Sequence, residues 1–213
     1  MTLRIDNRII ETVEEATLSL IIETEDRAPV TRVLNGKQTS AKQYGPDYST
    51  AYWNLKLIID LENDDECAPN FWTPVDGATF PAQLSQLSGT RLIVTDQTEA
   101  TYGTHGPALD ETVLELGDWL SPEAVLVRWT AEYEDWYSKP TQRLPFSFEG
   151  AVIFSGIEMR VKREEDATPI LSHVLPMLDQ SAFVMSLGRQ IELGPLVQAD
   201  RRRWREVFWR PKT

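Results

Sequence analysis

The sequence predicts a mainly β protein, in which antiparallel strands form a sandwich or two packed sheets and one or two C-terminal α-helices close the fold. Three observations lead to this prediction. Several long segments alternate apolar and polar residues, the chain contains seven Trp, six Tyr and seven Phe, and helical patterns are concentrated after residue 166. Alternation with a period of two is typical of strands with one buried face, and aromatic residues favour strands. An α+β fold with two related β-rich units is the alternative.

The first strand signals lie near the N-terminus. Residues 16–24 read ATLSLIIET, which places Leu18, Leu20 and Ile22 on one side. Residues 51–63 read AYWNLKLIIDLEN and alternate along their length. A strand this long with one apolar face belongs to an antiparallel sheet that is half exposed. The predicted inner residues of the second segment are Trp53, Leu55, Leu57, Ile59 and Leu61, whereas Asn54, Lys56 and Asp60 face the other way.

A second group of strand signals follows. Residues 91–96 (RLIVTD) and 112–119 (TVLELGDW) are short apolar runs, and longer alternating segments span 124–136, 146–154 and 156–164. These longer segments keep one phase within each run, as half-buried strands do. Their predicted inner residues are Val125, Val127, Trp129, Ala131, Tyr133, Phe146, Phe148, Gly150, Val152, Phe154, Ile157, Met159 and Val161.

Helical signals are found in the C-terminal part. Residues 166–180 read DATPILSHVLPMLDQ, with Asp166 or Thr168 as the N-cap, Pro169 in the first turn and a second proline, Pro176, that shortens or kinks the helix. Residues 193–209 read LGPLVQADRRRWREVFW and predict an amphipathic terminal helix. The apolar stripe of this helix would contain Leu196, Val197, Trp204, Val207 and Phe208, with Arg201, Arg202 and Arg205 mostly outside it.

Two segments resemble each other. Residues 154–164 read FSGIEMRVKRE and residues 87–97 read LSGTRLIVTDQ, so each has a bulky apolar residue, Ser-Gly and then a strand. A glycine at a strand entry permits a bulge or a sharp turn, which makes the similarity structural evidence and a hint of two similar β units. We therefore predict one domain, 1–213, with a helical segment at 166–210. The alternative is a first β unit at 1–96 and a second at 110–213.

The charge is negative and unevenly distributed. The chain carries a net charge of −12 and has a pI near 4.7, which argues against direct binding to nucleic acid or to anionic membranes. From Arg189 onward, seven Arg or Lys face three Asp or Glu, a local net of +4, so the remaining residues carry −16. An acidic surface suits a basic protein partner, and an Arg-rich C-terminal helix could instead dock on a neighbouring copy to form a homo-oligomer.

The compartment and the cofactor chemistry follow from what the sequence contains. Cys67 is the single cysteine, so no intramolecular disulfide forms, and the first residues have no continuous apolar segment of the kind found in secretory signals. We expect a cytoplasmic protein without a membrane span. No nucleotide-binding, hydrolase or zinc motif occurs in the sequence, and we predict no cofactor and no metal.

The long polar loops are the expected location of function. Residues 62–81 contain an acidic cluster, and residues 95–111 are rich in glycine and polar residues. His105 is the better of the two histidines as a loop contact or acid–base group, whereas His173 is expected to be a core or edge residue. Exposed aromatic residues such as Trp72, Tyr102, Trp136 and Tyr137 could form a carbohydrate-binding platform.

Two acidic clusters are candidates for binding a partner. Residues 62–66 (ENDDE) lack the spacing of a calcium-binding EF-hand loop, so we interpret them as a solvated acidic turn. Residues 132–137 (EYEDWY) place carboxylates beside aromatic rings but on the polar face of a strand, which favours an exposed surface over a glycosidase site. The predicted partner-binding residues are Asp64, Asp65, Glu66, Glu132, Glu134 and Asp135.

Three functional classes are open on these observations. The first is a non-enzymatic, acidic protein-binding module that neutralises a basic partner, for example an immunity protein against a toxin that acts on nucleic acid. The second is a β-rich structural subunit of a phage or secretion assembly, docked through the Arg-rich C-terminal helix. The third is a carbohydrate-binding or hydrolytic protein that uses the aromatic loops and the carboxylates.

Overall fold

A computed structural model describes residues 1–6, 8–24, 30–34, 37–41, 44–59, 69–94, 100–102, 108–135, 139–192 and 203–212. Only the backbone is described for 8–12, 30–34, 37–41, 102, 191–192 and 203. The strands are β1 (Thr2–Ile5), β2 (Arg8–Thr12), β3 (Glu15–Glu23), β4 (Val30–Leu34), β5 (Lys37–Ala41), β6 (Thr50–Ile58), β7 (Pro69–Pro74), β8 (Arg91–Ile93), β9 (Ala100–Tyr102), β10 (Leu109–Ser121), β11 (Ala124–Asp135), β12 (Gln142–Val161), β13 (Phe183–Glu192) and β14 (Arg203–Pro211). The helix α1 spans Ala167–Val174, and short 3₁₀ turns occur at η1 (Pro46–Tyr48), η3 (Leu84–Leu87), η4 (Glu164–Asp166) and η5 (Gln180–Ala182).

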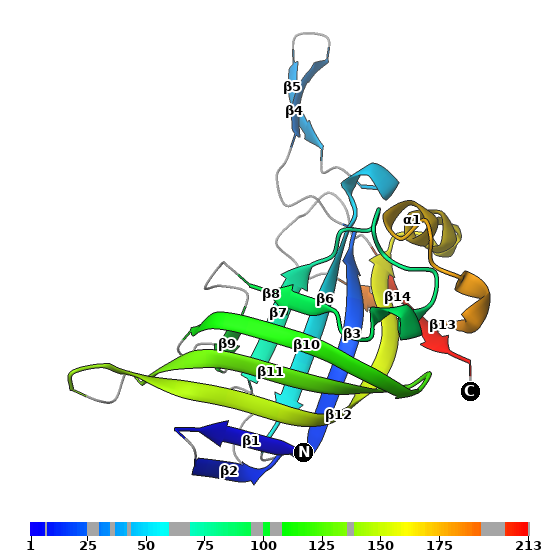
Figure 1. Ribbon diagram of the computed structural model, residues 1–213. Coiled ribbons are helices and arrows are strands. Elements are labelled where there is room, and N and C mark those ends of the chain that lie inside the picture. The colour runs from blue at the N-terminus through cyan, green and yellow to red at the C-terminus, as the bar shows by residue number, and fades with distance from the viewer. Residues whose placement is uncertain are drawn as a thin grey trace.

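The strands form one large sheet and a separate hairpin, so the predicted mainly β class is confirmed. The twelve-stranded sheet follows the order β8-β10-β11-β12-β3-β6-β7-β9, and β4 pairs with β5 in the hairpin. In Figure 1, β10, β11 and β12 cross in front of β3, β6 and β7, and the hairpin projects away from them. The two ends of this strand order approach each other, because an isolated bridge joins Thr101 of β9 to Ala108, just before β10. The sheet therefore coils so that its two halves pack face to face. The predicted units 1–96 and 110–213 contribute strands to this same sheet.

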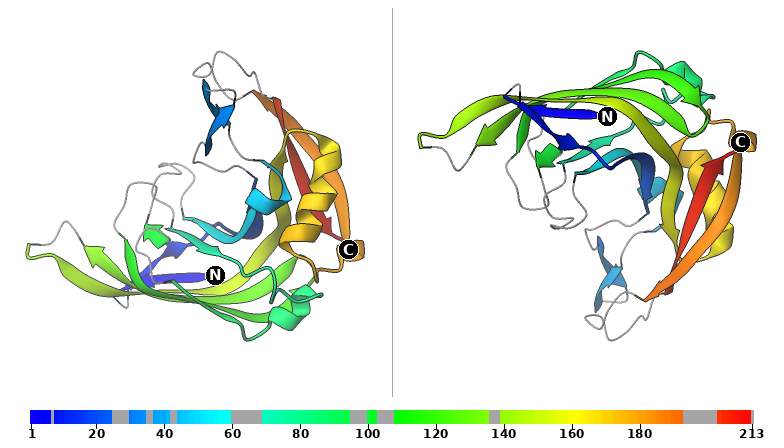
Figure 2. Two further views of the ribbon diagram at one scale, coloured as in Figure 1. Left: turned by 90° about the horizontal axis from the view of Figure 1, so that it is seen from above. Right: turned by 90° about the horizontal axis from the view of Figure 1, so that it is seen from below.

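The long strand β12 is the centre of this sheet. Along one edge it pairs with β11 and, further on, with β14; along the other edge it pairs with β1 and then with β3. Only the pairing of β12 with β3 is parallel among these four. Figure 2 shows β12 curving from the layer of β10 and β11 toward β14 and β13. One strand of 20 residues thus connects the two ends of the molecule.

A bulge at Gly156 divides β12 into two phases. Phe154 is buried before it and Ile157 is buried after it, so the alternation shifts by one residue. The pairing with β3 shifts register between Phe154 and Gly156, and Gly156 has φ +106°. A Cβ at this position would lie 2.2 Å from the backbone oxygen of Trp209. The interpretation of this Ser-Gly as a strand bulge is confirmed. The similar glycine, Gly89 (φ +80°), lies instead in the turn that precedes β8.

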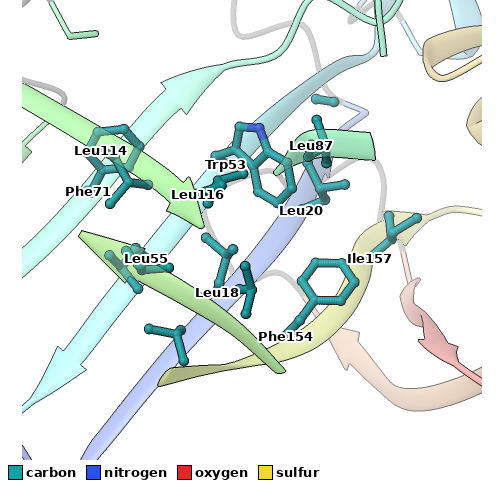
Figure 3. Close-up of a cluster of buried hydrophobic side chains, with 14 of the residues drawn as sticks. Leu18, Leu20, Trp53, Leu55, Phe71, Leu87, Leu114, Leu116, Phe154 and Ile157 are labelled. Atoms are coloured by element: carbon teal, nitrogen blue, oxygen red, sulfur yellow. The ribbon is translucent and has the colours of Figure 1, made fainter. Parts of the chain in front are cut away.

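Aromatic and aliphatic side chains fill the space between the two halves of the sheet. Figure 3 shows Leu18, Trp53, Phe71, Leu116 and Phe154 meeting there from β3, β6, β7, β10 and β12. The Trp129 ring lies 4.9 Å from Phe146 and 5.8 Å from Phe71, centroid to centroid. The predicted inner faces are confirmed wherever the residues are described, with Tyr133, Ile59 and Gly150 only partly buried; Leu61 and Asp60 lie outside the described residues.

The predicted helical segment 166–210 is correct for its first part. The helix α1 begins after Asp166, contains Pro169 in its first turn and ends at Val174, shortly before Pro176. Residues 183–192 and 203–211 are strands β13 and β14, so the predicted terminal helix is wrong for residues 203–209. Residues 193–202, with the predicted stripe residues Leu196 and Val197, lie outside the described residues. The sequence WREVFW fits a helical stripe, but Val207 and Trp209 also alternate, and pairing with β12 and β13 satisfies the backbone.

We expect Gly156→Ala to lower the free energy of unfolding by about 2–4 kcal/mol, because the methyl group meets the Trp209 carbonyl and the backbone conformation becomes strained. Urea denaturation measures this change. Gly45→Ala is the matched control, since Gly45 has φ +123° with no atom within 4 Å of an added Cβ. We expect that control to lose less, about 1–2 kcal/mol, because only the backbone conformation is strained and no atom is displaced. Equal losses for the two variants would contradict the steric explanation.

Candidate functional site

A cavity of about 380 Å³ lies on the face of the sheet that points away from the core, over β3, β12 and β14. We call it the carboxylate–aromatic cavity. Its walls combine acidic, aromatic and aliphatic side chains from four separate parts of the chain. They consist of Ile21, Ile22, Glu23, Thr24, Trp72, Glu158, Met159, Arg160, Trp204, Glu206 and Phe208.

Strand alternation places the polar wall of the cavity. Ile157, Met159 and Val161 of β12 are buried in the core, so Glu158 and Arg160 project from the opposite face. On β14, Val207 and Trp209 are buried, which places Glu206 and Phe208 on that same opposite face. The antiparallel register sets Glu158 against Phe208 and Arg160 against Glu206. Residues distant in sequence therefore become direct cross-strand neighbours.

The β3 wall is fixed to β12 beside these residues. Parallel pairing aligns Ile21 with Glu158 and Ile22 with Met159. Just after β3, the buried Thr24 hydroxyl donates a hydrogen bond to the backbone oxygen of Arg160. Backbone pairing thus sets the position of the β3 wall relative to Glu158 of β12 and Glu206 of β14.

The charges that line the cavity are mostly negative. Three glutamates, Glu23, Glu158 and Glu206, stand against one arginine, Arg160. Glu206 is 17% exposed and pairs with Arg189 of β13, with Nε and Oε2 3.5 Å apart. The cavity is consequently a local acidic site in a chain that is acidic overall.

Glu158 is the carboxylate with the most unusual environment. Burial raises its pKa above that of an ordinary glutamate, and a hydrogen bond from Ser155 and the charge of Arg210 oppose this effect. The Ser155 hydroxyl lies 3.4 Å from Oε1 and is its only hydrogen-bond donor among the described residues. Glu158 is therefore a half-buried carboxyl group that the described part of the chain stabilises weakly.

Aromatic rings form the apolar wall. The Trp72 ring of β7 lies 5.0 Å from the Tyr52 ring of β6, and the Arg210 guanidinium lies 5.7 Å from the Phe208 centroid. Trp204 is only 2% exposed, and its indole Nε1 has no hydrogen-bond partner among the described residues. A buried indole N–H usually has an acceptor. The indole Nε1 atoms of Trp119 and Trp129 are buried in the same way, so this feature is not specific to the cavity. The cavity thus combines carboxylate acceptors with ring faces.

The position of Trp204 is fixed by its neighbours at the end of β12. The Tyr44 ring packs edge-on against it at 5.6 Å, and the ammonium group of Lys162 lies 5.4 Å from the Trp204 ring and 4.4 Å from the Tyr44 ring. The Tyr44 hydroxyl donates to Asp166 Oδ2 at 2.9 Å and accepts the backbone N–H of Lys162 at 3.0 Å. Burial, more than any other effect, raises the pKa of Tyr44 to about 12, so it stays a neutral donor.

Asp166 joins this group to the start of α1. Burial would raise its pKa, but hydrogen bonds from Arg163 and Tyr44 outweigh that effect and lower it. The Arg163 guanidinium approaches the two carboxylate oxygens at 2.6 and 3.1 Å. The ionised Asp166 therefore anchors the tyrosine that supports Trp204.

The predicted partner-binding residues of β11, Glu132, Glu134 and Asp135, lie elsewhere, toward the end of that strand. Arg143 bridges Glu132 at 3.3 Å and Asp110 at 3.2 Å, so Glu132 already has an ion pair within the chain. Glu134 and Asp135 follow at the end of β11, opposite Arg143 and Gln142 in the backbone register. None of these three carboxylates lines the cavity.

Of the other predicted site residues, Trp72 lies in the cavity. Asp64, Asp65, Glu66 and His105 lie outside the described residues, as do Cys67, Trp136 and Tyr137, and Tyr102 is described only by its backbone in β9. His173 lies at the exposed edge of α1, with Nε2 3.7 Å from Asp47 Oδ1. Within the described ranges, no three His, Cys, Asp or Glu side chains are grouped as metal ligands would be.

Sequence reasoning missed Glu158, Trp204, Glu206 and Phe208. The alternation of residues 156–164 predicts that Glu158 faces away from the core, but it does not show what lies opposite. Because residues 193–209 were interpreted as a helix, the polar face of strand β14 was not predicted. The signal that could have revealed the site is the alternation of Val207 and Trp209 with Glu206 and Phe208.

Comparison with known proteins adds no relative from which a function could be transferred. No protein-family model matches the sequence, and no curated protein or solved structure is significantly similar to it. Among the described residues, no helix is long and apolar enough to cross a membrane. The fold and the site together define the class of the molecule: it is a mainly β protein with an acidic cavity lined by aromatic residues.

We expect the stability of the protein to depend on pH through Glu158. Because its folded pKa is raised, its contribution is fully present below the ordinary glutamate pKa and is lost as pH rises through the raised value. Glu158→Gln should remove this pH dependence. It should also stabilise the fold at neutral pH by less than about 1 kcal/mol, because solvent screens a half-buried group.

Urea denaturation across the acidic to neutral pH range measures both effects. Glu164→Gln is the control, because Glu164 is exposed and lies outside the cavity. Identical pH profiles for the wild type and Glu158→Gln would contradict this assignment.

Proposed function

We propose that the protein is a non-enzymatic binding module that captures a basic protein partner through the carboxylate–aromatic cavity and its surroundings. The observation that carries this proposal is the composition of the cavity, where three glutamates and three aromatic residues accompany one arginine. Carboxylates pair with cationic side chains, and the faces of aromatic rings attract the same groups. The site is thus chemically suited to a lysine or an arginine of another protein.

The net charge supports the same proposal over longer distances. A net charge of −12 steers a basic partner toward the molecule and accelerates their encounter. Neutralisation of a basic toxin that acts on nucleic acid is one concrete form of this function. Glu132, Glu134 and Asp135 stay a predicted second contact surface, although Glu132 would exchange its Arg143 partner for the incoming group.

Carbohydrate binding is a second candidate, favoured by one observation. Trp72 lies beside carboxylates in a cavity of the size that small ligands occupy. Sugars stack on such rings and donate hydrogen bonds to such carboxylates. The assembly-subunit alternative was predicted from an Arg-rich C-terminal helix, whereas residues 203–211 of that segment form strand β14. Docking on a neighbouring copy stays a prediction.

A labelled lysine-rich peptide tests the proposed function. We expect its affinity to fall as salt rises, and to fall at least about fivefold in the double variant Glu158→Gln plus Glu206→Gln, because two carboxylate contacts are lost. Fluorescence anisotropy at low and physiological salt measures both. The matched control is Glu123→Gln plus Glu164→Gln, which removes the same charge from exposed positions outside the cavity.

Three results would contradict the proposal. They are peptide binding that does not depend on salt, equal loss of affinity in the two double variants, and no binding at all. A glycan array examines the second candidate directly. Saturable binding of a neutral glycan that Trp72→Ala abolishes would favour carbohydrate binding over a protein partner.

A further inference from the structure

We infer that the carboxylate–aromatic cavity receives an arginine side chain from an extended segment of the partner, with its guanidinium group against Glu158. This inference rests on the proposed function and specifies which chemical group enters the site. It follows from three properties of the cavity: its size, the distribution of its ion pairs and its aromatic wall.

The size favours one side chain with adjoining backbone over a large ligand. A volume of about 380 Å³ is at the lower end of the range for pockets that bind small molecules. The cavity lies over a sheet face, and both Trp72 of β7 and Phe208 of β14 line it. An extended peptide can cross such a face while one residue enters the cavity.

The ion pairs identify Glu158 as the contact for the incoming cation. Glu206 already binds Arg189, and that contact is mostly buried on the glutamate side. Glu158 has no ion pair within 4.0 Å among the described residues, although the charges of Arg210 and Arg160 act on it. A half-buried carboxylate with a single long hydrogen bond from Ser155 has unused acceptor capacity. A cation from another molecule would supply the missing partner.

The aromatic wall favours guanidinium over ammonium. A guanidinium group is planar, stacks on ring faces and is more weakly hydrated than an ammonium group, so it enters a partly buried site with a smaller desolvation penalty. The protein itself provides an example at the rim, where the Arg210 guanidinium lies 5.7 Å from the Phe208 centroid. Trp72 offers another ring in the same cavity.

Three small probes test this inference: N-acetyl-arginine methylamide and its lysine and citrulline counterparts. Citrulline has nearly the shape of arginine without the charge. We expect the arginine probe to shift the indole N–H resonances of Trp72 and Trp204 in a saturable manner. The lysine probe should bind at least about threefold more weakly, and the citrulline probe should give no saturable shift.

Variants locate the contact. We expect Glu158→Gln to weaken the arginine probe at least about fivefold and the exposed control Glu164→Gln to leave it unchanged. Both substitutions keep the side-chain shape, and thermal melting verifies that the variants fold. Should Glu158→Gln fail to fold, the comparison of arginine with citrulline on the wild-type protein decides the question without it.

The outcomes separate the two levels of the proposal. Equal shifts with the arginine and citrulline probes, or arginine binding that is unchanged in Glu158→Gln, would overturn the inference. If the lysine-rich peptide binds as proposed but the arginine probe gives no shift, the inference fails and the proposed function stands. If neither the peptide nor any probe binds, both fail.

Discussion

The structure depends on the bulge at Gly156, where the backbone adopts φ +106° and the Trp209 carbonyl occupies the place of a side chain. This one residue lets β12 change phase without leaving the sheet. Before the bulge, β12 buries Phe154 beside Trp53 of β6, and after it β12 buries Ile157 and Met159 where it pairs with β14. The same change turns Glu158 outward. The core and the cavity are therefore two consequences of one backbone conformation.

The cavity exists only when distant parts of the chain are paired. Its walls come from the end of β3, from Trp72 of β7, from β12 and from β14, and these elements are joined by the parallel β3–β12 and the antiparallel β12–β14 ladders. Tyr44, which packs against Trp204, donates a hydrogen bond from its hydroxyl to Asp166 at the start of α1. Because sheet pairing, and not a loop, sets these positions, the carboxylates and rings are held in a defined arrangement before any ligand arrives. A preorganised site loses less conformational entropy on binding.

Local patterns in the sequence were sufficient for much of the fold and for little of the site. β3, β6, β11 and both halves of β12 have one apolar face, and that alternation identified their buried residues correctly. β14 was missed because WREVFW fits a helical period as well as a strand period, and only its pairing with two strands decides between them. β13 was missed for another reason: Val184, Met185 and Leu187 are all exposed, so residues 184–190 have no buried face to produce alternation. Cross-strand neighbours such as Glu158 and Phe208 are set by long-range register, which no local pattern records.

The position of Glu158 affects the stability of the fold as well as the chemistry of the cavity. Burial disfavours its ionised form, so a neutral side chain of the same size would suit the isolated fold better at neutral pH. Residues that lower stability in this way are found where function requires them. A cation bound at Glu158 reverses the balance, since the surroundings that make the unpaired charge unfavourable strengthen its attraction to an opposite charge. Half-burial thus lowers the stability of the free protein slightly, and it would make the same carboxylate a strong contact in the proposed complex.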